Sequence, residues 1–337
     1  MTNPLDEAFD DDDTPALYIG KFFKAVAQRL VAGESLAHVQ GWAAAEGIDL
    51  LEWPETPVLL SVDEQLAERQ KMARLLAWQM ARFLPLPQLK FKPMALSSPG
   101  RNDPCSCGSG QKLKLCCASM ATTLPLFTSE SLAPYLFLAM PRESWASLPG
   151  KVPSTWVMNA MGAWLRLDDN SSGEALKQAS DDALSTAVAL LAPWTELKAP
   201  WPAKYAELYD LLGDVYLELD MPAEREALAH RLVERGDRLL KALGWERRAL
   251  MFFDLGQIDD AYECLRQTQL LDPDNPRTAM LELTLLNFSG EHQQVQERAA
   301  WHAKRLSRLP SNPEREHVIT MLRRVAKEGV EAFFERS

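Results

Sequence analysis

Four of the five cysteines in this chain fall within thirteen positions, inside the stretch GRNDPCSCGSGQKLKLCC at residues 100–117. They form two pairs separated by eight residues: Cys105 and Cys107, then Cys116 and Cys117. Between the pairs, the run Gly-Ser-Gly at 108–110 allows a positive-φ turn that would bring the second arm back against the first. Thiolates on two facing arms suit a tetrahedral metal ion with metal–sulfur bonds of about 2.3 Å. The spacing therefore predicts a metal site.

The expected cellular setting favours a metal over disulfides. The chain begins Met1-Thr2-Asn3-Pro4 and continues with acidic residues, without the basic stretch and apolar core of a secretory signal. Its most apolar runs are too short to span a bilayer. We therefore expect a cytoplasmic protein with no membrane insertion, in which clustered thiols bind metal. Four thiolates leave no open coordination position, so the ion would be structural and would contribute folding free energy.

The cysteine stretch closely resembles the SEC-C motif, a small metal-binding module named after the C-terminus of the SecA preprotein translocase motor. The resemblance implies that all four cysteines are ligands, that Zn²⁺ is the expected metal with iron as a substitute, and that the module contacts other proteins or the ribosome. This chain departs from the family pattern in three ways. Leu113 replaces the usual aromatic residue, Cys117 stands where SecA-like modules often have histidine, and the module lies a third of the way along the chain.

Basic residues gather around the cysteines. Residues 85–120 contain five Lys or Arg against Asp103 alone, in a chain whose formal net charge is −11. That overall charge argues against general attraction to nucleic acids or membrane surfaces. Two interpretations of the local excess stay open: it neutralises the negative centre of four thiolates, or it forms a contact surface for an acidic protein or an RNA backbone. The candidate contact residues are Arg101, Lys112 and Lys114.

The elements that must hold this site are mainly helical. Residues 1–13 carry six acidic residues and no basic one, which predicts a disordered acidic tail. Residues 14–85 then show helical spacing of apolar residues and helix-start signals, which predict an N-terminal helical domain. The start signals are Thr14, Ser35 and the capping box of Ser61 with Glu64. Residues 33–68 hold eight acids and no Lys or Arg, which excludes a DNA-reading helix-turn-helix there.

Three further divisions follow from composition. Residues 86–120 form a proline-rich connector and the metal module, because prolines between 85 and 104 prevent a long helix. Residues 121–200 read as a helical middle region. Residues 201–337 read as a set of α–α repeats, in which a final helix from about Arg315 to Phe334 would cover the last apolar face.

Those repeats resemble the 34-residue tetratricopeptide (TPR) pattern. The best unit contains Ala249, Phe252, Gly256, Ala261, Leu265 and Pro273 in the expected order. Gly290 follows Gly256 by 34 positions. Asp220 occupies the corresponding turn 36 positions before Gly256. The resemblance covers about residues 203–312 and implies a concave surface that binds peptides or helices. The alternative is a generic helical bundle with coincidental glycine spacing.

We find no catalytic motif in the sequence. Five histidines are scattered without an HExxH helix, no phosphate-binding glycine loop lies between a strand and a helix, and Cys264 reads as a core thiol. We therefore predict a mainly α, non-enzymatic adaptor that binds protein partners, which the SEC-C resemblance links to the ribosome or the Sec export machinery. Two alternatives remain: a nucleic-acid-associated factor that uses the basic metal module, and an enzyme whose site is assembled from dispersed residues.

Overall fold

The computed structural model describes residues 20–51, 61–118, 127–167 and 172–329. These residues form fourteen α-helices joined by short 3-10 turns and loops, with isolated β-bridges and no β-strand. The predicted mainly α fold class is therefore confirmed. The chain divides into two compact units, residues 1–196 and 197–337. The predicted acidic tail, residues 1–13, and the N-cap at Thr14 lie outside the described residues.

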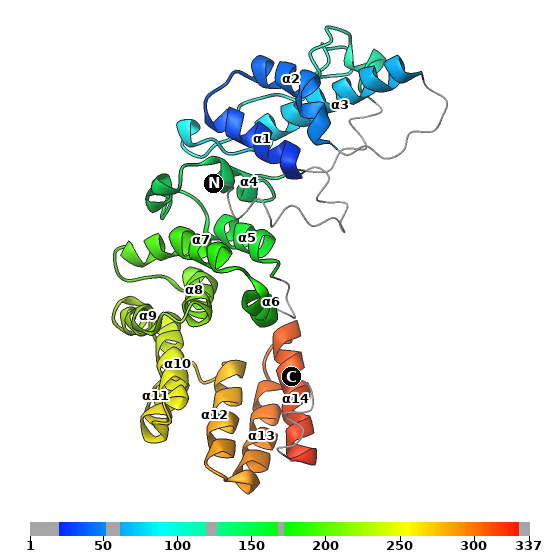
Figure 1. Ribbon diagram of the computed structural model, residues 1–337. Coiled ribbons are helices and arrows are strands. Elements are labelled where there is room, and N and C mark those ends of the chain that lie inside the picture. The colour runs from blue at the N-terminus through cyan, green and yellow to red at the C-terminus, as the bar shows by residue number, and fades with distance from the viewer. Residues whose placement is uncertain (1–19, 52–60, 119–126, 168–171, 330–337) are drawn as a thin grey trace. The chain divides into compact units, whose positions relative to one another are not determined.

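The first unit begins with three helices that pack together (Figure 1): α1 Gly20–Val31, α2 Leu36–Ala45 and α3 Val62–Phe83. Two of their predicted start signals are confirmed. The Ser35 side chain accepts a hydrogen bond from the His38 amide at the start of α2. At the start of α3, Ser61 and Glu64 cap each other reciprocally. Such boxes satisfy amides that the first helical turn leaves without partners.

Helix α3 changes character along its length. Its first half is largely exposed, and Leu66 keeps 44% of its surface in solvent. Its second half is buried on more than one face, because the adjacent residues Leu75 and Leu76 are both enclosed. Leu75 is buried together with the cysteines of the predicted metal module. The additional buried face of α3 is therefore the one that carries the module.

The rest of the first unit consists of shorter helices. As predicted, the proline-rich connector forms no long helix, and only a 3-10 turn at Pro87–Leu89 interrupts it. The α-helices that follow are α4 Ala133–Ala139, α5 Ser154–Leu165, α6 Ser172–Gln178 and α7 Asp181–Leu191. Further 3-10 turns span Gly47–Leu50, Leu113–Leu115, Arg142–Ser147 and Ala192–Glu196. Helix α4 packs against both α1 and α5, so it connects the first three helices to the later ones.

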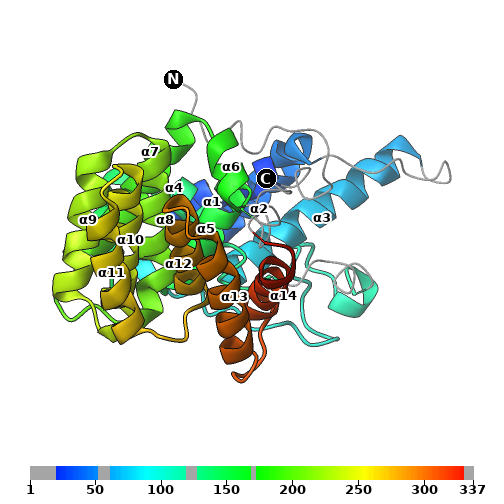
Figure 2. The same ribbon diagram turned by 90° about the horizontal axis from the view of Figure 1, so that it is seen from below.

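The second unit is a succession of seven helices, each packed against the next in the chain. They follow a 3-10 turn at Ala203–Tyr205 and are α8 Ala206–Glu218, α9 Pro222–Arg235, α10 Arg238–Asp254, α11 Ile258–Leu271, α12 Pro276–Phe288, α13 His292–Leu306 and α14 Pro313–Glu328. The last three lie side by side in both views (Figures 1 and 2). Helix α14 starts two residues before the predicted Arg315 and is followed by Gly329 at φ 85°, while Phe334 lies outside the described residues.

One turn geometry recurs between paired helices of this unit. Asp220, Gly256 and Gly290 all adopt a left-handed backbone, with φ of 51°, 70° and 75°, where α8, α10 and α12 end. The residue after each donates its amide to a carbonyl five positions earlier, over 2.9, 2.8 and 3.0 Å. This pattern satisfies the last carbonyls of a helix and reverses the chain. The 34-residue glycine spacing in the sequence thus corresponds to the same turn in successive helix pairs.

Charged side chains also hold α8, α10 and α12 together. The buried Arg247 of α10 donates to Asp210 and, at 2.5 Å, to Asp214, both on α8. Arg277 of α12 reaches Asp210 at 2.6 Å and Glu246 of α10 at 3.1 Å. Removing one partner from such a buried network leaves an uncompensated charge, which is strongly destabilising.

None of the described helices combines the length and the apolar character that a bilayer crossing requires.

Candidate metal centre

The two cysteine arms are held by a short backbone hairpin. Pro104 and Lys112 form an antiparallel bridge, and the Cys105 amide donates to the carbonyl of Gln111 over 2.7 Å. The turn between the arms contains two glycines with φ of 75° and 74°, Gly108 and Gly110. Residues with a Cβ rarely adopt this backbone, so the predicted role of the glycines in reversing the chain is confirmed.

The adjacent cysteines of the second arm follow a tight helical turn. A 3-10 turn at Leu113–Leu115 ends at Cys116, whose amide donates to the carbonyl of Leu113 over 3.1 Å. The backbone of Cys116 then bends sharply, with φ −128° and ψ −94°. Neighbouring side chains in an extended segment would point apart. The bend instead brings the sulfurs of Cys116 and Cys117 to 3.6 Å from each other.

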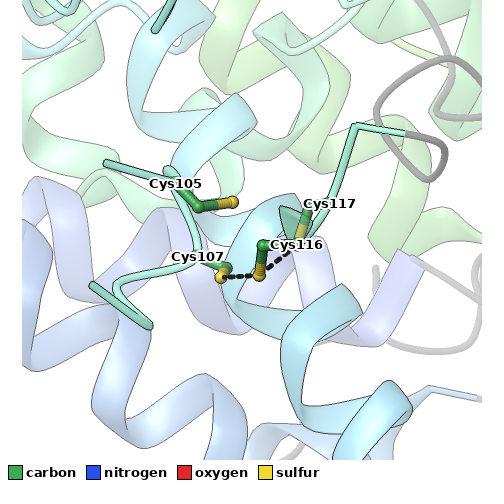
Figure 3. A group of neighbouring side chains, drawn as sticks. All are labelled: Cys105, Cys107, Cys116 and Cys117. Carbon is green, nitrogen blue, oxygen red and sulfur yellow. Dashed lines mark hydrogen bonds between the residues drawn. The ribbon is translucent and has the colours of Figure 1, made fainter. Parts of the chain in front are cut away.

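All four sulfurs converge on one point (Figure 3). The sulfurs of Cys107 and Cys116 are 3.4 Å apart, and all four lie within 4.8 Å of one another. In a tetrahedral site with metal–sulfur bonds of about 2.3 Å, the sulfurs are separated by about 3.8 Å. The four thiols are unpaired by disulfides and fit such an ion closely. Among the described residues they form the one group of His, Cys, Asp or Glu side chains that could hold a metal.

The local environment shifts the pKa values of the clustered thiols in different directions. Burial alone would raise the pKa of Cys107, but hydrogen bonds with Ser109, Cys116 and Cys105 together outweigh it and lower this pKa to about 7. The Ser109 hydroxyl also lies 3.2 Å from the sulfur of Cys116. Burial raises the pKa of Cys117, and its hydrogen bonds with the other cysteines add to that shift. Hydrogen bonds to ligand sulfurs of this kind orient and stabilise them around a metal.

Helices α2 and α3 hold the module from its inner side. Leu75 of α3 is 2% exposed and belongs to one buried cluster with Cys105, Cys107 and Cys117. Gln40 of α2 donates to the carbonyl of Ser106 at 2.6 Å and to that of Arg74 in α3 at 3.2 Å. One amide group thus joins α2, α3 and the cysteine hairpin. The hydrogen bond from Lys71 to Glu68 raises the pKa of Lys71, and the charges of Cys116 and Cys117 add to this shift.

The three candidate contact residues lie on the outer side of the module. Arg101, Lys112 and Lys114 are exposed, and none of their side chains makes an ion pair or hydrogen bond within the described parts of the chain. Next to Lys114 in the chain, Leu115 keeps 71% of its area in solvent. The module therefore exposes three basic side chains and one large apolar side chain to solvent.

Sequence reasoning did not identify Gln40, Lys71 and Leu75 as supports of the site. Leu75 carried a weak signal, because it is a large apolar residue in a segment whose apolar residues show helical spacing. Gln40 and Lys71 carried no such signal in the sequence, because each interacts with the cysteine segment, which lies more than thirty residues away in the chain. By contrast, Cys264 is buried in an apolar cluster of the second unit, as predicted, and burial raises its pKa.

The comparison with protein families agrees with the geometry. The model of the SEC-C motif matches residues 101–119. Comparisons with curated proteins and with solved structures give no match. The matched segment contains all four clustered cysteines. The cysteine hairpin that docks on α2 and α3 is therefore a SEC-C motif.

Proposed function

We propose that this chain is a non-enzymatic, cytoplasmic adaptor whose SEC-C module, stabilised by a bound Zn²⁺, presents a basic face to a protein partner. The observation that carries the proposal is the two-sidedness of the module. Its cysteines face α3, whereas Arg101, Lys112, Lys114 and Leu115 face solvent. Exposed cations beside an exposed large apolar residue are typical of a protein contact surface.

The proposed metal follows from the donor set. Four thiolates suit Zn²⁺, and iron is the substitute with a similar preference for sulfur. A closed set of four ligands leaves no position for a substrate. The ion therefore shapes the contact surface and takes no part in a reaction.

The second unit supports a binding role through repeated helix pairs. We propose that α8 to α13 form three TPR-like pairs and that α14 closes the series. The equivalent left-handed turns at Asp220, Gly256 and Gly290 support this assignment. Stacked helix pairs expose long surfaces that bind peptides or helices.

Two described features support a non-enzymatic role. Cys264 is enclosed by apolar side chains, and burial raises its pKa, so it is a poor nucleophile. His302 is buried against Glu282 at 2.7 Å, where it links α13 to α12. The SEC-C resemblance alone suggests that the partner belongs to the translation or Sec export machinery.

The test is capture of partners by the intact chain. The full-length protein is used as bait, and captured proteins are identified by mass spectrometry after low-salt and high-salt washes. We expect one principal protein partner, and we expect R101E/K112E/K114E to lose it while retaining the metal. The matched control is K151E/K177E/K198E, which reverses three exposed cations outside residues 86–120 and should keep the partner.

Two outcomes would contradict the proposal. If the module variant and the control captured the partner equally well, the basic residues of the module would not contribute to the interface. Capture that nuclease treatment abolishes would instead favour the alternative function, a nucleic-acid-associated factor that uses the same basic module.

A further inference from the structure

A second basic surface lies in the other unit, between α13 and α14. These two helices border an open groove of about 650 Å³. Lys304, near the end of α13, and Arg308, in the turn after it, line one bank, and Arg323 and Lys327 of α14 line the other. Among the described residues, no acidic side chain lines the groove. Residues 298–327 carry eight Lys or Arg against two Glu, although the chain as a whole is acidic.

The four cations that line the groove differ from the arginines nearby on α13 and α14. The neighbouring arginines each pair with a carboxylate: Arg298 with Glu282, Arg305 with Asp274 and Arg324 with Glu328. Lys304, Arg308 and Lys327 are exposed and make no ion pair or hydrogen bond with any described residue, and Arg323 donates only to the Ser307 hydroxyl at 3.0 Å. Four converging positive charges therefore have no counter-charge within the described part of the chain.

Small side chains complete the lining of the groove. They are three alanines, Ala300, Ala303 and Ala326, together with Ser307. Small residues allow the backbone of another helix to approach closely. On α14, Arg323 and Lys327 are four residues apart, which places them on one helix face about 6 Å from each other. Carboxylates at the same spacing on a helix laid along the groove would meet them.

A nucleic acid fits this groove less well. Single-stranded RNA and DNA are bound by basic grooves that also offer aromatic side chains for base stacking. None of the described residues that line this groove is aromatic. The exposed aromatic residue on α13, Trp301, is contacted instead by the guanidinium groups of Arg298 and Arg305, at 4.4 and 5.1 Å from its ring centre.

We propose that the groove between α13 and α14 binds an acidic α-helical segment of a partner protein. Its carboxylates pair with the cations of the two banks, and its small apolar residues rest against the alanines. The inference rests on the proposed protein-binding function and adds the chemistry of a partner segment. The groove is a surface separate from the metal module, so experiments can reject the groove proposal without rejecting the proposed role of the module, and the reverse.

The test measures binding of a defined probe to the full-length protein by fluorescence anisotropy. The probe is a labelled helical peptide of repeated Glu-Ala-Ala-Leu-Glu-Ala-Ala units, and the matched probe has Gln in place of every Glu. We expect the acidic peptide to bind in a salt-dependent manner and the Gln peptide to bind at least about ten-fold more weakly. Undetectable binding of the acidic peptide, or equal binding of the two, would overturn the proposal.

Variants locate the binding on the groove. K304E/K327E changes one cation on each bank, at positions whose side chains make no ion pair or hydrogen bond with a described residue, and keeps good helix formers. We expect it to weaken acidic-peptide binding about ten-fold or more, and the milder K304Q/K327Q to weaken it less. The matched control K151E/K198E should bind as the wild type does. Far-ultraviolet circular dichroism and thermal melts establish that each variant is folded.

Two further binding measurements test whether the groove, and not the metal module, binds the acidic peptide. A peptide with Lys in place of Glu should bind K304E/K327E more tightly than the wild type. The module variant R101E/K112E/K114E should keep acidic-peptide binding, so loss of the cellular partner in that variant with peptide binding intact separates the two surfaces. Tight binding of a single-stranded RNA in place of the peptide, lost in K304E/K327E, would overturn the assignment to a protein partner.

Discussion

Cys107 is the residue on which the metal site depends most visibly. Its side chain is fully buried, and its sulfur lies 3.4 Å from that of Cys116. We expect Cys107→Ser to lower metal content well below one ion per chain and to lower the thermal midpoint by several degrees, because the folding free energy supplied by metal is lost. Elemental analysis and thermal denaturation measure the two effects.

The fifth cysteine provides the control for this change. Cys264→Ala removes a buried thiol that lies outside the cluster, so it should cost stability through a small cavity and leave metal content unchanged. If Cys107→Ser also left metal content unchanged, Cys107 would not be a ligand.

Glu282 should make the second unit sensitive to acid. Burial alone would raise the pKa of Glu282, but hydrogen bonds and charges from His302 and Arg298 outweigh it and lower this pKa to about 2. A depressed carboxyl pKa contributes stability that is fully present above the ordinary value of 4.5 and is lost as the pH falls toward 2. We expect Glu282→Gln to lower the free energy of unfolding by about 2 kcal/mol at neutral pH.

The pH dependence distinguishes this charge effect from a general packing defect. The difference in unfolding free energy between wild type and Glu282→Gln should shrink as the pH is lowered from about 4.5 toward 2. Denaturant titrations at neutral and acid pH measure it. A difference that stays constant over this range would contradict the assigned pKa shift.

At the scale of elements, α2 and α3 act as the platform of the metal module. Gln40→Ala removes the donor to the Ser106 carbonyl, which should cost about 1–2 kcal/mol. It should also weaken metal retention against a chelator, because the cysteine hairpin loses one of its attachments. Gln88→Ala is the matched control. The Gln88 side chain donates a hydrogen bond of 2.9 Å to the carbonyl of Leu30 in α1, and not to the cysteine hairpin. Equal metal retention in the two variants would show that docking and metal binding are independent.

Helices α9 and α10 approach each other at Gly244. A Cβ there would lie 2.8 Å from the Ala229 carbonyl oxygen and 2.9 Å from the Leu232 Cβ. We expect Gly244→Ala to destabilise the protein by about 1–3 kcal/mol through overpacking. Gly162→Ala in α5 has open space around the added methyl and should be neutral or stabilising by up to about 1 kcal/mol. Equal effects in a denaturant titration would argue against close helix contact at Gly244.

Local signals predicted the elements that local forces determine. The capping box at Ser61, the cap at Ser35 and the glycine turn at 108–110 each depend on residues within a few positions of one another. The supports of the metal module could not be predicted in this way, because Gln40 meets Ser106 only through packing of α2 on α3. The ionic network around Arg247 could not be predicted either, because Arg247 and Asp210 meet only through packing of α10 on α8. Charged residues also usually indicate an exposed helix face.

At the scale of the whole molecule, an acidic chain carries two exposed basic surfaces. One is the outer face of the SEC-C module in the first unit, and the other is the groove between α13 and α14 in the second. The sequence indicated the basic excess of the first, because cysteines and basic residues share one short segment, but it left open whether that excess forms a surface. The second joins residues from two helices, so it becomes visible only when α13 and α14 pack together.

The central claim is that the four clustered sulfurs bind one metal ion that holds the SEC-C module in shape. X-ray absorption spectroscopy of the purified full-length protein, combined with elemental analysis, tests it most directly. The account predicts about one zinc or iron per chain, surrounded by four sulfur atoms at about 2.3 Å. A protein without bound metal, or a metal ligated by oxygen and nitrogen atoms, would contradict it.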